Sequence, residues 1–361
     1  MENTIFKIKS ELMPILHIYP IIIPLKLFKD RHNEINTYVG MNPSMFIEPD
    51  GNVTILIREV NYRKFKKGSY SIYGNISTSL YSILKGKVFK NEPLSIENMT
   101  CSNLTYEYNI PTYPSYWIGL EDIRFVTANS LLAIIPECHP GGKPAIFKAT
   151  LTTSNNSNNS NNSSNSNPDD SLITSFVSCK PDKIDEKNWL PYIDTDGSQK
   201  IIYSLSPFRI KSIEEDDLIT ISLPKEKEET LKGYHGSTNG IEYNNGIERL
   251  FLIHINNEKP YHRWLLFNPD DLTVKVSKIF TFFKYSHIEF SCSLCSFTPF
   301  RISDAENVSP SSSSLKTPLK TGVSNDNWYN NNRIFITLGV NDDKAFIMET
   351  CPLFIDSMFA D

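Results

Sequence analysis

The sequence predicts an all-β protein, for two reasons. It contains 21 Phe and 17 Tyr, and such ring side chains, together with the abundant Ile and Thr, pack well on a pleated surface. In addition, five places along the chain repeat one pattern, in which a polar or charged motif and a turn-like gap precede a short apolar strand. The expected apolar strands are residues 52–59, 130–137, 200–207, 249–256 and 333–340.

The repeats also predict how the strands are arranged. No helix is expected between them, which favours small antiparallel sheets set around an axis, that is, a five-bladed β-propeller formed as a single domain by residues 1–361. The innermost strands of a propeller line a shared channel, so the polar motifs would meet there. A β-sandwich or a jelly roll is the alternative, because spacing alone does not separate radial from stacked sheets. The polar motifs are residues 41–44, 119–124, 186–192, 234–240 and 286–293.

Three polar segments interrupt the strand pattern. Residues 152–170 and 309–327 are low-complexity, rich in Asn and Ser, and cannot bury enough apolar area to offset their ordering entropy. We expect both to be disordered insertions. Residues 224–233 read as a charged loop. Strand patterns resume on both sides of all three segments, so none of them marks a domain boundary.

The charge and the cysteine content of the sequence indicate which partners and which cellular location to expect. The formal net charge of -5 comes from interspersed acidic and basic residues, so no footprint for nucleic acid or an anionic membrane is visible. The apolar N-terminal stretch 13–25 is interrupted by Pro14, Pro20 and Pro24, which argues against a signal peptide or a membrane span. The six scattered cysteines favour a reducing, cytoplasmic location. The oligomeric state stays open.

The motif "GLEDIR" is the strongest candidate for chemistry. Glu121, Asp122 and Arg124 lie in a segment whose neighbours predict burial, where an unpaired carboxylate is costly. A nearby arginine can keep one carboxylate ionised, while a desolvated second one acts as a general acid. The alternative is an ordinary surface ion pair on a strand.

Two further motifs suit a polyhydroxylated ligand. The first, residues 186–189, offers a ring to stack on a sugar together with charged and amide groups. The second, residues 235–238, offers a dense set of neutral hydrogen-bond donors and acceptors. Both are equally typical of turns. The residues are Glu186, Lys187, Asn188 and Trp189 in the first motif, and His235, Ser237 and Thr238 in the second.

Polar residues in the later repeats extend the candidate site. His254, His262 and Arg263 lie on or near the fourth repeat strand, although a histidine in an apolar strand is more often a core residue than a catalyst. Glu289, a carboxylate in an apolar strand, is the second candidate for acid or base chemistry. Asp342, which precedes a second aspartate, fits either a ligand site or a hairpin turn.

Metal and nucleotide motifs are missing from the sequence. It contains no phosphate loop, dinucleotide fingerprint, G-x-S-x-G elbow or H-E-x-x-H. The pair Cys292 and Cys295 has the spacing of metal ligands but no second pair nearby, so we expect both thiols to be buried in strands. The sequence therefore requires no metal.

The order of the motifs resembles that of glycoside hydrolase family 130, the five-bladed propeller mannoside phosphorylases and β-1,2-mannosidases. The shared features are "NPS" from Asn42, Arg58 at the end of the next strand, "EDIR" at residues 121–124, and a late "GVNDD" ending at Asp343. The elements "EKNW", "HGST", "HRW" and "IEF" are closer to a less studied branch of glycan-processing propeller proteins. The sequence departs from the family at Ile123, where proline is usual.

The resemblance implies a carbohydrate-active enzyme that cleaves or transfers a glycosyl unit, mannosyl by analogy. It implies Asp122 as the proton donor, Arg124 as its companion and Arg58 as a contact for phosphate or another anion of the substrate. Water activated by Glu289 would give hydrolysis, phosphate would give phosphorolysis, and another sugar would give transfer. No cofactor is implied, with inorganic phosphate as a possible co-substrate. The alternative is a non-catalytic propeller that binds a glycan or a protein.

Aromatic rings complete the predicted sugar site. A ring that lies flat against a pyranose face shields apolar C–H groups from water, so rings near the polar motifs are candidates for stacking. For each ring, packing in the core is the alternative. The candidates are Trp117, Trp189, Tyr234 and Trp264.

Overall fold

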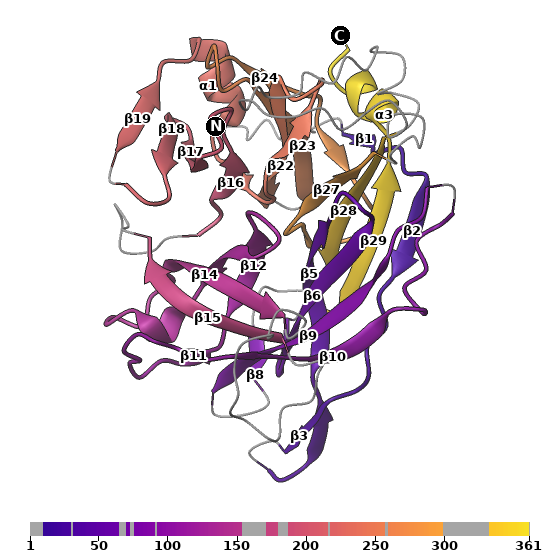
Figure 1. Cartoon of the computed structure of the whole chain (residues 1–361), viewed down its shortest axis with the longest axis vertical. Helices are drawn as coiled ribbons and strands as arrows, with labels where there is room; N and C mark the ends of the chain where they lie inside the picture. Colours follow the sequence, from indigo (N-terminus) through magenta and orange to yellow (C-terminus); the bar gives the residue numbers. More distant parts are fainter. Residues whose placement is uncertain are drawn as a thin grey trace, which may run out of the picture.

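The structure is a computed structural model, and strands dominate it, as the sequence predicts (Figure 1). The described helices are short: α1 (Lys225–Leu231), α3 (Pro352–Ser357) and the 3-10 turn η1 (Pro136–Cys138). None of them has the length and apolar character to cross a membrane. The structure describes residues 10–29, 32–64, 70–72, 76–90, 92–153, 171–179, 187–215, 217–256, 259–298 and 332–360.

A nine-stranded sheet holds the first two repeats. It consists of two antiparallel arrays, β5-β6-β9-β10 and β12-β13-β14-β15, joined by parallel pairing of β10 with β15. β11 (Trp117–Ile118) adds to β9. The other strands are β5 (Val39–Ile47), β6 (Asn52–Val60), β9 (Ser77–Lys87), β10 (Thr100–Tyr106), β12 (Glu121–Phe125), β13 (Ser130–Ile134), β14 (Ile146–Thr153) and β15 (Ser171–Ser178).

The next two repeats form separate sheets. A four-stranded sheet runs in sequence order from β16 to β19, and a seven-stranded sheet is built around β22 and β23. The first contains β16 (Leu190–Ile193), β17 (Gln199–Leu205), β18 (Phe208–Ser212) and β19 (Leu218–Ile221). The second contains β1 (Glu11–Leu12), β20 (His235–Gly236), β21 (Ile241–Tyr243), β22 (Glu248–Asn256), β23 (Pro260–Phe267), β24 (Val274–Val276) and β25 (Phe280–Thr281).

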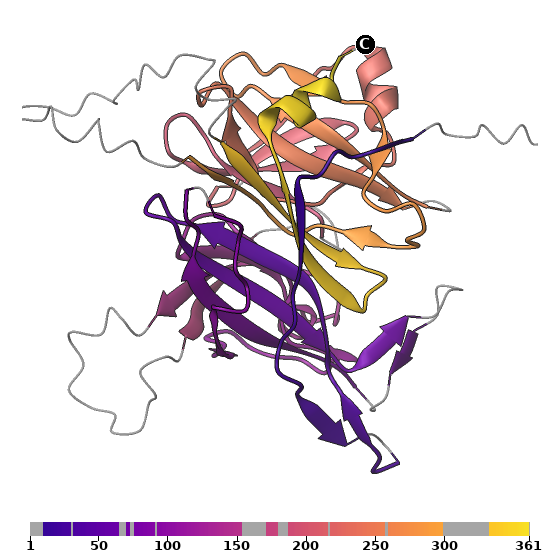
Figure 2. The ribbon, with the colours of Figure 1, turned by 90° about the vertical axis from the view of Figure 1, so that its right-hand side faces the viewer.

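The last sheet joins the two ends of the chain. β2 pairs antiparallel with β29, so a strand near the start of the chain completes the C-terminal sheet, visible as indigo beside yellow in Figure 2. This sheet contains β2 (His17–Pro20), β26 (Glu289–Phe290), β27 (Leu294–Phe297), β28 (Arg333–Val340) and β29 (Lys344–Thr350). Two small hairpins pair β3 (Leu27–Lys29) with β4 (Ile35–Thr37) and β7 (Tyr62–Lys64) with β8 (Tyr70–Ile72).

The four-, seven- and five-stranded sheets are counted here as one array each, beside the two arrays of the nine-stranded sheet. The core consists of apolar clusters, each of which lies between two neighbouring arrays. One cluster lies between the two arrays of the nine-stranded sheet, and the next lies between β13–β14 and β17. Others separate β16–β18 from β22–β23, and β22–β23 from β28–β29. A further cluster packs β28–β29 and β27 against β5–β6, which brings the series back to the first array. Each array is thus buried between two neighbours.

Burial on both faces explains the unbroken apolar runs in the sequence. Successive side chains of a strand point to opposite faces. On β6, Leu56 packs into one cluster while Ile55 and Ile57 pack into another. On β13, Leu131 and Leu132 divide in the same way. All five repeat strands expected from the sequence are strands in the structure, as β6, β13, β17, β22 and β28.

The three polar segments have different outcomes. Residues 225–231 of the expected charged loop form helix α1, so that prediction was wrong; Lys, Glu and Leu all have good helix propensity. Most of 152–170 and all of 309–327 lie outside the described residues, although Thr152 and Thr153 end strand β14. The structure therefore does not test the expected disorder.

Candidate functional site

The charges of "GLEDIR" lie in a strand because that strand contains a bulge. The β12–β13 register shifts between Glu121 and Arg124, and Asp122 there has a φ of 45°. β5 has a matching irregularity between Met41 and Ser44, where Asn42 has a φ of 44°. A bulge turns a side chain out of the regular alternation, and Asn and Asp tolerate the left-handed conformation better than most residues. Both side chains are thereby turned toward each other.

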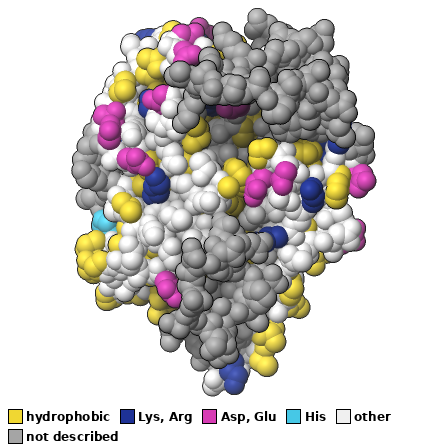
Figure 3. Space-filling model, viewed as in Figure 1, with side chains coloured by type: hydrophobic (Ala, Val, Ile, Leu, Met, Phe, Trp, Pro, Cys, Tyr) yellow, Lys and Arg dark blue, Asp and Glu magenta, His cyan; other side chains and the backbone are white. Residues whose placement is uncertain are grey.

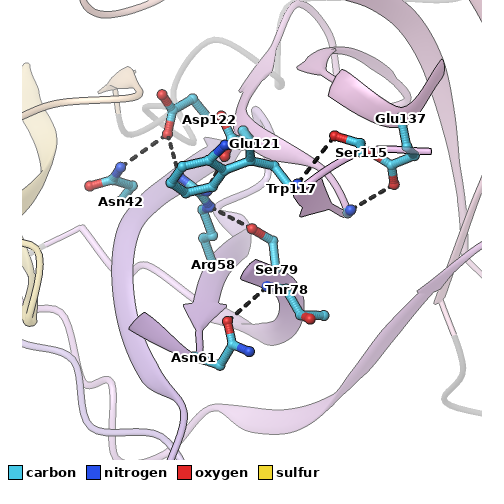
Figure 4. A network of polar contacts seen from close by, with 11 residues as sticks. Asn42, Arg58, Asn61, Thr78, Ser79, Ser115, Trp117, Glu121, Asp122 and Glu137 are labelled. Atoms are coloured by element: carbon cyan, nitrogen blue, oxygen red, sulfur yellow. Dashed lines mark hydrogen bonds and ion pairs between the residues drawn. The ribbon is translucent and has the colours of Figure 1, made fainter. Parts of the chain in front are cut away.

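Asp122, Asn42 and Arg58 form the centre of the site (Figure 4). The Asn42 Nδ2 donates to Asp122 Oδ1 at 3.0 Å and links β5 to β12, the two end strands of the nine-stranded sheet. Arg58, on β6, donates to the same Asp122 oxygen at 3.4 Å. One carboxylate oxygen of Asp122 is therefore held by two donors.

Arg58 is a buried cation that also holds the second carboxylate. Its side chain is 4% exposed, and its terminal nitrogen donates to Glu121 Oε1 at 2.5 Å. Its Nε donates to Ser79 Oγ at 3.0 Å, which fixes the plane of the guanidinium. Burial alone would lower the pKa of Arg58, but the charges of Glu121 and Asp122 hold it well above the ordinary value. The guanidinium therefore stays charged.

Glu121 is the carboxylate that is harder to ionise. Burial, and then the negative charge of Asp122, raise the pKa of Glu121 above its usual range, although Arg58 opposes the shift. The positive charge of Lys187 also acts on Glu121. Two neighbouring carboxylates in different environments are the arrangement that separates acid from base roles in glycosidic chemistry.

These groups face a hollow of about 510 Å³, which we call the carboxylate cavity. Trp117 forms part of its wall, with its ring at 84° to that of Tyr62 and the ring centroids 5.6 Å apart. Asp342 reaches it from the turn between β28 and β29, so both interpretations of that residue, ligand site and hairpin turn, are compatible with the structure. The residues expected from the sequence that line this cavity are Asn42, Arg58, Trp117, Glu121, Asp122, Lys187 and Asp342.

Eight lining residues carried no signal that we recognised in the sequence. Lys143 and Phe290 are the most consequential, because they add a cation and a ring to the wall. Phe290 directly follows Glu289 in "IEF", and it is this ring, rather than the carboxylate, that lines the cavity. The remaining six are Tyr62, Ile134, Pro136, Gly142, Pro144 and Ile288.

Gly339 on β28 allows β5 to approach closely enough to place Asn42. A Cβ on Gly339 would lie 2.2 Å from Asn42 Oδ1 and 2.9 Å from the Asn42 backbone nitrogen. We expect Gly339→Ala to displace the β5 bulge and to lower the free energy of unfolding by about 1–3 kcal/mol, measured by urea denaturation. Gly141→Ala is the control, because its Cβ would meet only side-chain atoms, those of His139 at 3.4 Å and of Lys143 at 3.6 Å. Equal stability of the two variants would contradict this role of Gly339.

The solved structures place this fold among known ones. The β-1,2-mannobiose phosphorylase from Listeria innocua, in complex with β-1,2-mannobiose, aligns with a TM-score of 0.51 at 11% identity, over 95% of this chain and 99% of that chain. The two chains share a fold. In the described residues of this chain that fold is built almost entirely of strands, as expected from the sequence.

Two other similar structures align with lower scores, and no sequence family is matched. CoXyl43, a β-xylosidase/α-arabinofuranosidase from a compost metagenome, has a TM-score of 0.45 at 11% identity, over 94% of this chain and 95% of its own. MPT-4, a mannose phosphorylase from Leishmania mexicana, has 0.41 at 10%, over 88% and 85%. No protein-family model and no curated protein matches the chain.

Glu289 is placed where it cannot act on a ligand in this conformation. Its side chain has 0% exposure, and its oxygens accept from the backbone N–H groups of Phe282 and Phe283 at 3.0 and 2.8 Å. The ring of His262 and the hydroxyl of Ser286 occupy the remaining positions. The expectations that Glu289 activates water and that His262 binds substrate were therefore wrong: both belong to a buried structural network.

Arg124, Ser237 and His254 form a second buried network. The Arg124 Nε donates to the Ser237 carbonyl at 2.7 Å, and the Ser237 hydroxyl lies 2.6 Å from His254 Nδ1. Burial, followed by nearby positive charges, lowers the pKa of His254, so its ring is neutral. These residues tie β12 to the seven-stranded sheet and do not line the carboxylate cavity. We expected these residues to contact the substrate, but in the structure they hold neighbouring strands together.

Several other candidates are core residues. Trp189 and Trp264 are 2% and 0% exposed, and Trp264 donates its indole N–H to Met13 Sδ at 3.4 Å, so neither can stack on a sugar. The hydroxyl of Thr238, 0% exposed, accepts from the Leu252 N–H at 3.0 Å. Cys292 and Cys295 are buried free thiols, as expected. Among the described residues, no cluster of His, Cys, Asp and Glu is arranged to hold a metal ion.

A second hollow of about 330 Å³ adjoins the first, and we call it the basic cavity. It lies between β17 and β20 and shares Lys187 with the carboxylate cavity. Tyr234 lines it and accepts from the Nε of Arg263 at 3.1 Å. Glu186 lies outside the described residues. The residues expected from the sequence that line the basic cavity are Lys187, Asn188, Tyr234 and His235.

Proposed function

We propose that the protein is a carbohydrate-active enzyme that cleaves or transfers a glycosyl unit in the carboxylate cavity. The observation that carries this proposal is that Asn42 and Arg58, from two other strands, both donate to one carboxylate oxygen of Asp122 beside an open cavity. Asp122 and Asn42 adopt positive φ values at irregularities in their strands, and these irregularities turn both side chains toward the cavity. The fold shared with a mannobiose phosphorylase supports the choice of substrate class.

We infer that the arrays are the five blades of a propeller. The five apolar clusters separate the arrays in cyclic order, and a cyclic order of packed sheets is what a radial arrangement requires. Pairing of β2 with β29 would then close the ring through the N-terminal strand. In a sandwich, by contrast, sheets are stacked as two layers and no such cycle of interfaces arises.

Asp122 is the proposed proton donor to the leaving oxygen, directly or through a sugar hydroxyl. Its Oδ1 is held by Arg58 and Asn42, while the side chain remains 17% exposed to the cavity. Trp117 offers a ring for sugar stacking. Among the lining residues, Lys143 is the proposed contact for inorganic phosphate, because Arg58 is already paired with both carboxylates.

The acceptor decides the reaction, and a product assay distinguishes the possibilities. The full chain is incubated with manno-oligosaccharides of defined linkage, with and without inorganic phosphate, and the products are separated by anion-exchange chromatography. Free mannose without phosphate indicates hydrolysis, mannose 1-phosphate indicates phosphorolysis, and longer oligosaccharides indicate transfer. β-1,2-Mannobiose is the first substrate to test, because the phosphorylase of the same fold was solved with it bound.

The competing function is a non-catalytic propeller that binds a glycan or a protein. It would be favoured by the absence of any product in all three arms, together with saturable binding of an oligosaccharide measured by calorimetry. If the protein neither turned over nor bound any of the manno-oligosaccharides, the proposed substrate class would be contradicted.

A further inference from the structure

The basic cavity has the composition of a site for an anion. Among the described residues that line it, none is acidic, whereas Lys187 and His235 are basic. Partial burial, and then the charge of the nearby Lys187, lower the pKa of His235, so its ring is a neutral hydrogen-bonding group. Lys187, with no acidic residue among the described lining residues, creates a positive potential that an anion would neutralise.

The polar groups of this cavity are suited to donate hydrogen bonds. Because the Tyr234 hydroxyl accepts from the Nε of Arg263, its own proton is available to an acceptor in the cavity. The guanidinium of Arg263 also lies over the Tyr234 ring, 5.6 Å from its centroid, which makes the hydroxyl a stronger donor. Asn188, held at a φ of 64°, adds an amide. Several donors around one space match the acceptor oxygens of a phosphoryl group.

Two geometric features indicate that the ligand is larger than a free anion. The volume of about 330 Å³ is in the range of small-molecule sites, and apolar side chains of Leu190 and Ile202 form part of the wall. Lys187 lines both cavities, so a molecule in one reaches the boundary of the other. The approach of the walls depends on Gly236, whose Cβ would lie 2.1 Å from the Asn188 carbonyl oxygen.

We propose that the basic cavity binds the phosphorylated end of a phosphorylated sugar that is the acceptor or the leaving group of the reaction. The phosphoryl group lies among Lys187, Tyr234 and His235, and the rest of the molecule extends past Lys187 toward Asp122. This inference rests on the proposed function, because the sugar ring must reach the carboxylate cavity. It adds a requirement that the proposed function lacks, namely a charged group on the second sugar.

Titration calorimetry on the full chain tests the proposal with four probes: mannose, mannose 1-phosphate, mannose 6-phosphate and inorganic phosphate. We expect at least one sugar phosphate to bind about tenfold more tightly than mannose, since charge-assisted hydrogen bonds are the strong ones. Lys187→Gln and Tyr234→Phe should each remove most of that difference. Lys87→Gln, an exposed lysine on β9, is the matched control and should preserve it. The better of the two sugar phosphates identifies the phosphorylated position.

Three outcomes would overturn the proposal. The first is equal affinity for mannose and both sugar phosphates. The second is an equal loss in Lys87→Gln and Lys187→Gln. The third is inorganic phosphate binding as tightly as the sugar phosphates with the same losses, which would leave a site for free phosphate only. Asp122→Asn should retain the sugar-phosphate preference, so failure of the proposed reaction, seen as absent turnover, is distinguishable from failure of this site.

Discussion

Asp122→Asn is expected to lower kcat/KM toward the best manno-oligosaccharide about 10³-fold, because it removes the proton donor. The measurement is product formation at saturating and limiting substrate, with and without phosphate. Substrate affinity should change little, since the amide keeps the size of the carboxylate. A loss confined to kcat would agree with a role in bond cleavage.

Asn is the appropriate replacement because it preserves the local structure. Asp122 has a φ of 45°, a conformation that Asn adopts readily and that would strain Ala. The Asn side-chain oxygen can still accept from Asn42 and Arg58, which now hold Asp122 Oδ1. The variant therefore separates loss of the proton from loss of geometry, and its melting temperature should stay close to that of the parent.

Glu121→Gln is the informative control. Glu121 faces the same cavity and pairs with Arg58 at 2.5 Å, but we expect a smaller loss because Asp122, and not Glu121, is the proposed proton donor. Asp50→Asn, in an exposed turn before β6, should have no effect on turnover. If Glu121→Gln lost activity and Asp122→Asn kept it, the proton donor would be Glu121, whose pKa is raised by burial. Full activity in both variants would remove the cavity from the reaction.

The strands could be predicted because burial on two faces leaves a strong signal. β13 and β22 each place neighbouring residues into different apolar clusters, which requires an uninterrupted run of apolar letters. Helix α1 was missed because its alternating Lys and Glu are equally common in loops, and only Leu231 in it is buried. The cyclic order of the clusters is a long-range property that spacing along the chain does not contain.

The site was only partly predictable, for a physical reason. A carboxylate flanked by apolar residues in the sequence indicates burial. Asp122 and Glu289 share that pattern but differ in the groups that surround them in the folded protein. Asp122 is turned by a bulge into a cavity, whereas Glu289 is surrounded by donors from its own sheet and loop. A bulge is set by the pairing of two strands, so no single stretch of sequence reveals it. Trp117 and Trp264 present the same difficulty, since rings serve cavities and cores alike.

The buried network around Glu289 should contribute strongly to the stability of the fold. Both carboxylate oxygens accept from donors: Oε2 from His262 and the Phe282 N–H, and Oε1 from Ser286 and the Phe283 N–H. In Glu289→Gln, one oxygen becomes an NH₂ group that must face donors, and His262 loses its buried partner. We expect the free energy of unfolding at pH 7, measured by urea denaturation, to fall by about 3 kcal/mol.

The same network predicts how stability depends on pH. Burial alone would raise the pKa of Glu289, but hydrogen bonds from His262, Ser286 and the Phe282 N–H overcome that effect, so the pKa lies below its usual value. A carboxyl whose pKa is lower in the folded state stabilises the fold above its unfolded pKa of about 4.3, and this contribution is lost as the pH falls through the folded pKa. The free energy of unfolding should therefore decline below about pH 4.3, with a limiting slope of about 1.4 kcal/mol per pH unit for each proton taken up.

Comparing the parent with Glu289→Gln isolates this residue from the other carboxylates. Glu349, held by Arg333 at 2.6 and 3.0 Å and by Tyr19, also has a lowered pKa, so acid destabilisation persists in the variant with a smaller slope. Glu97→Gln is the control, since that glutamate lies on the exposed surface and should leave the slope nearly unchanged. Identical slopes in the parent and in Glu289→Gln would mean that Glu289 binds the same number of protons in the folded and unfolded states, and would contradict the lowered pKa of its carboxyl group.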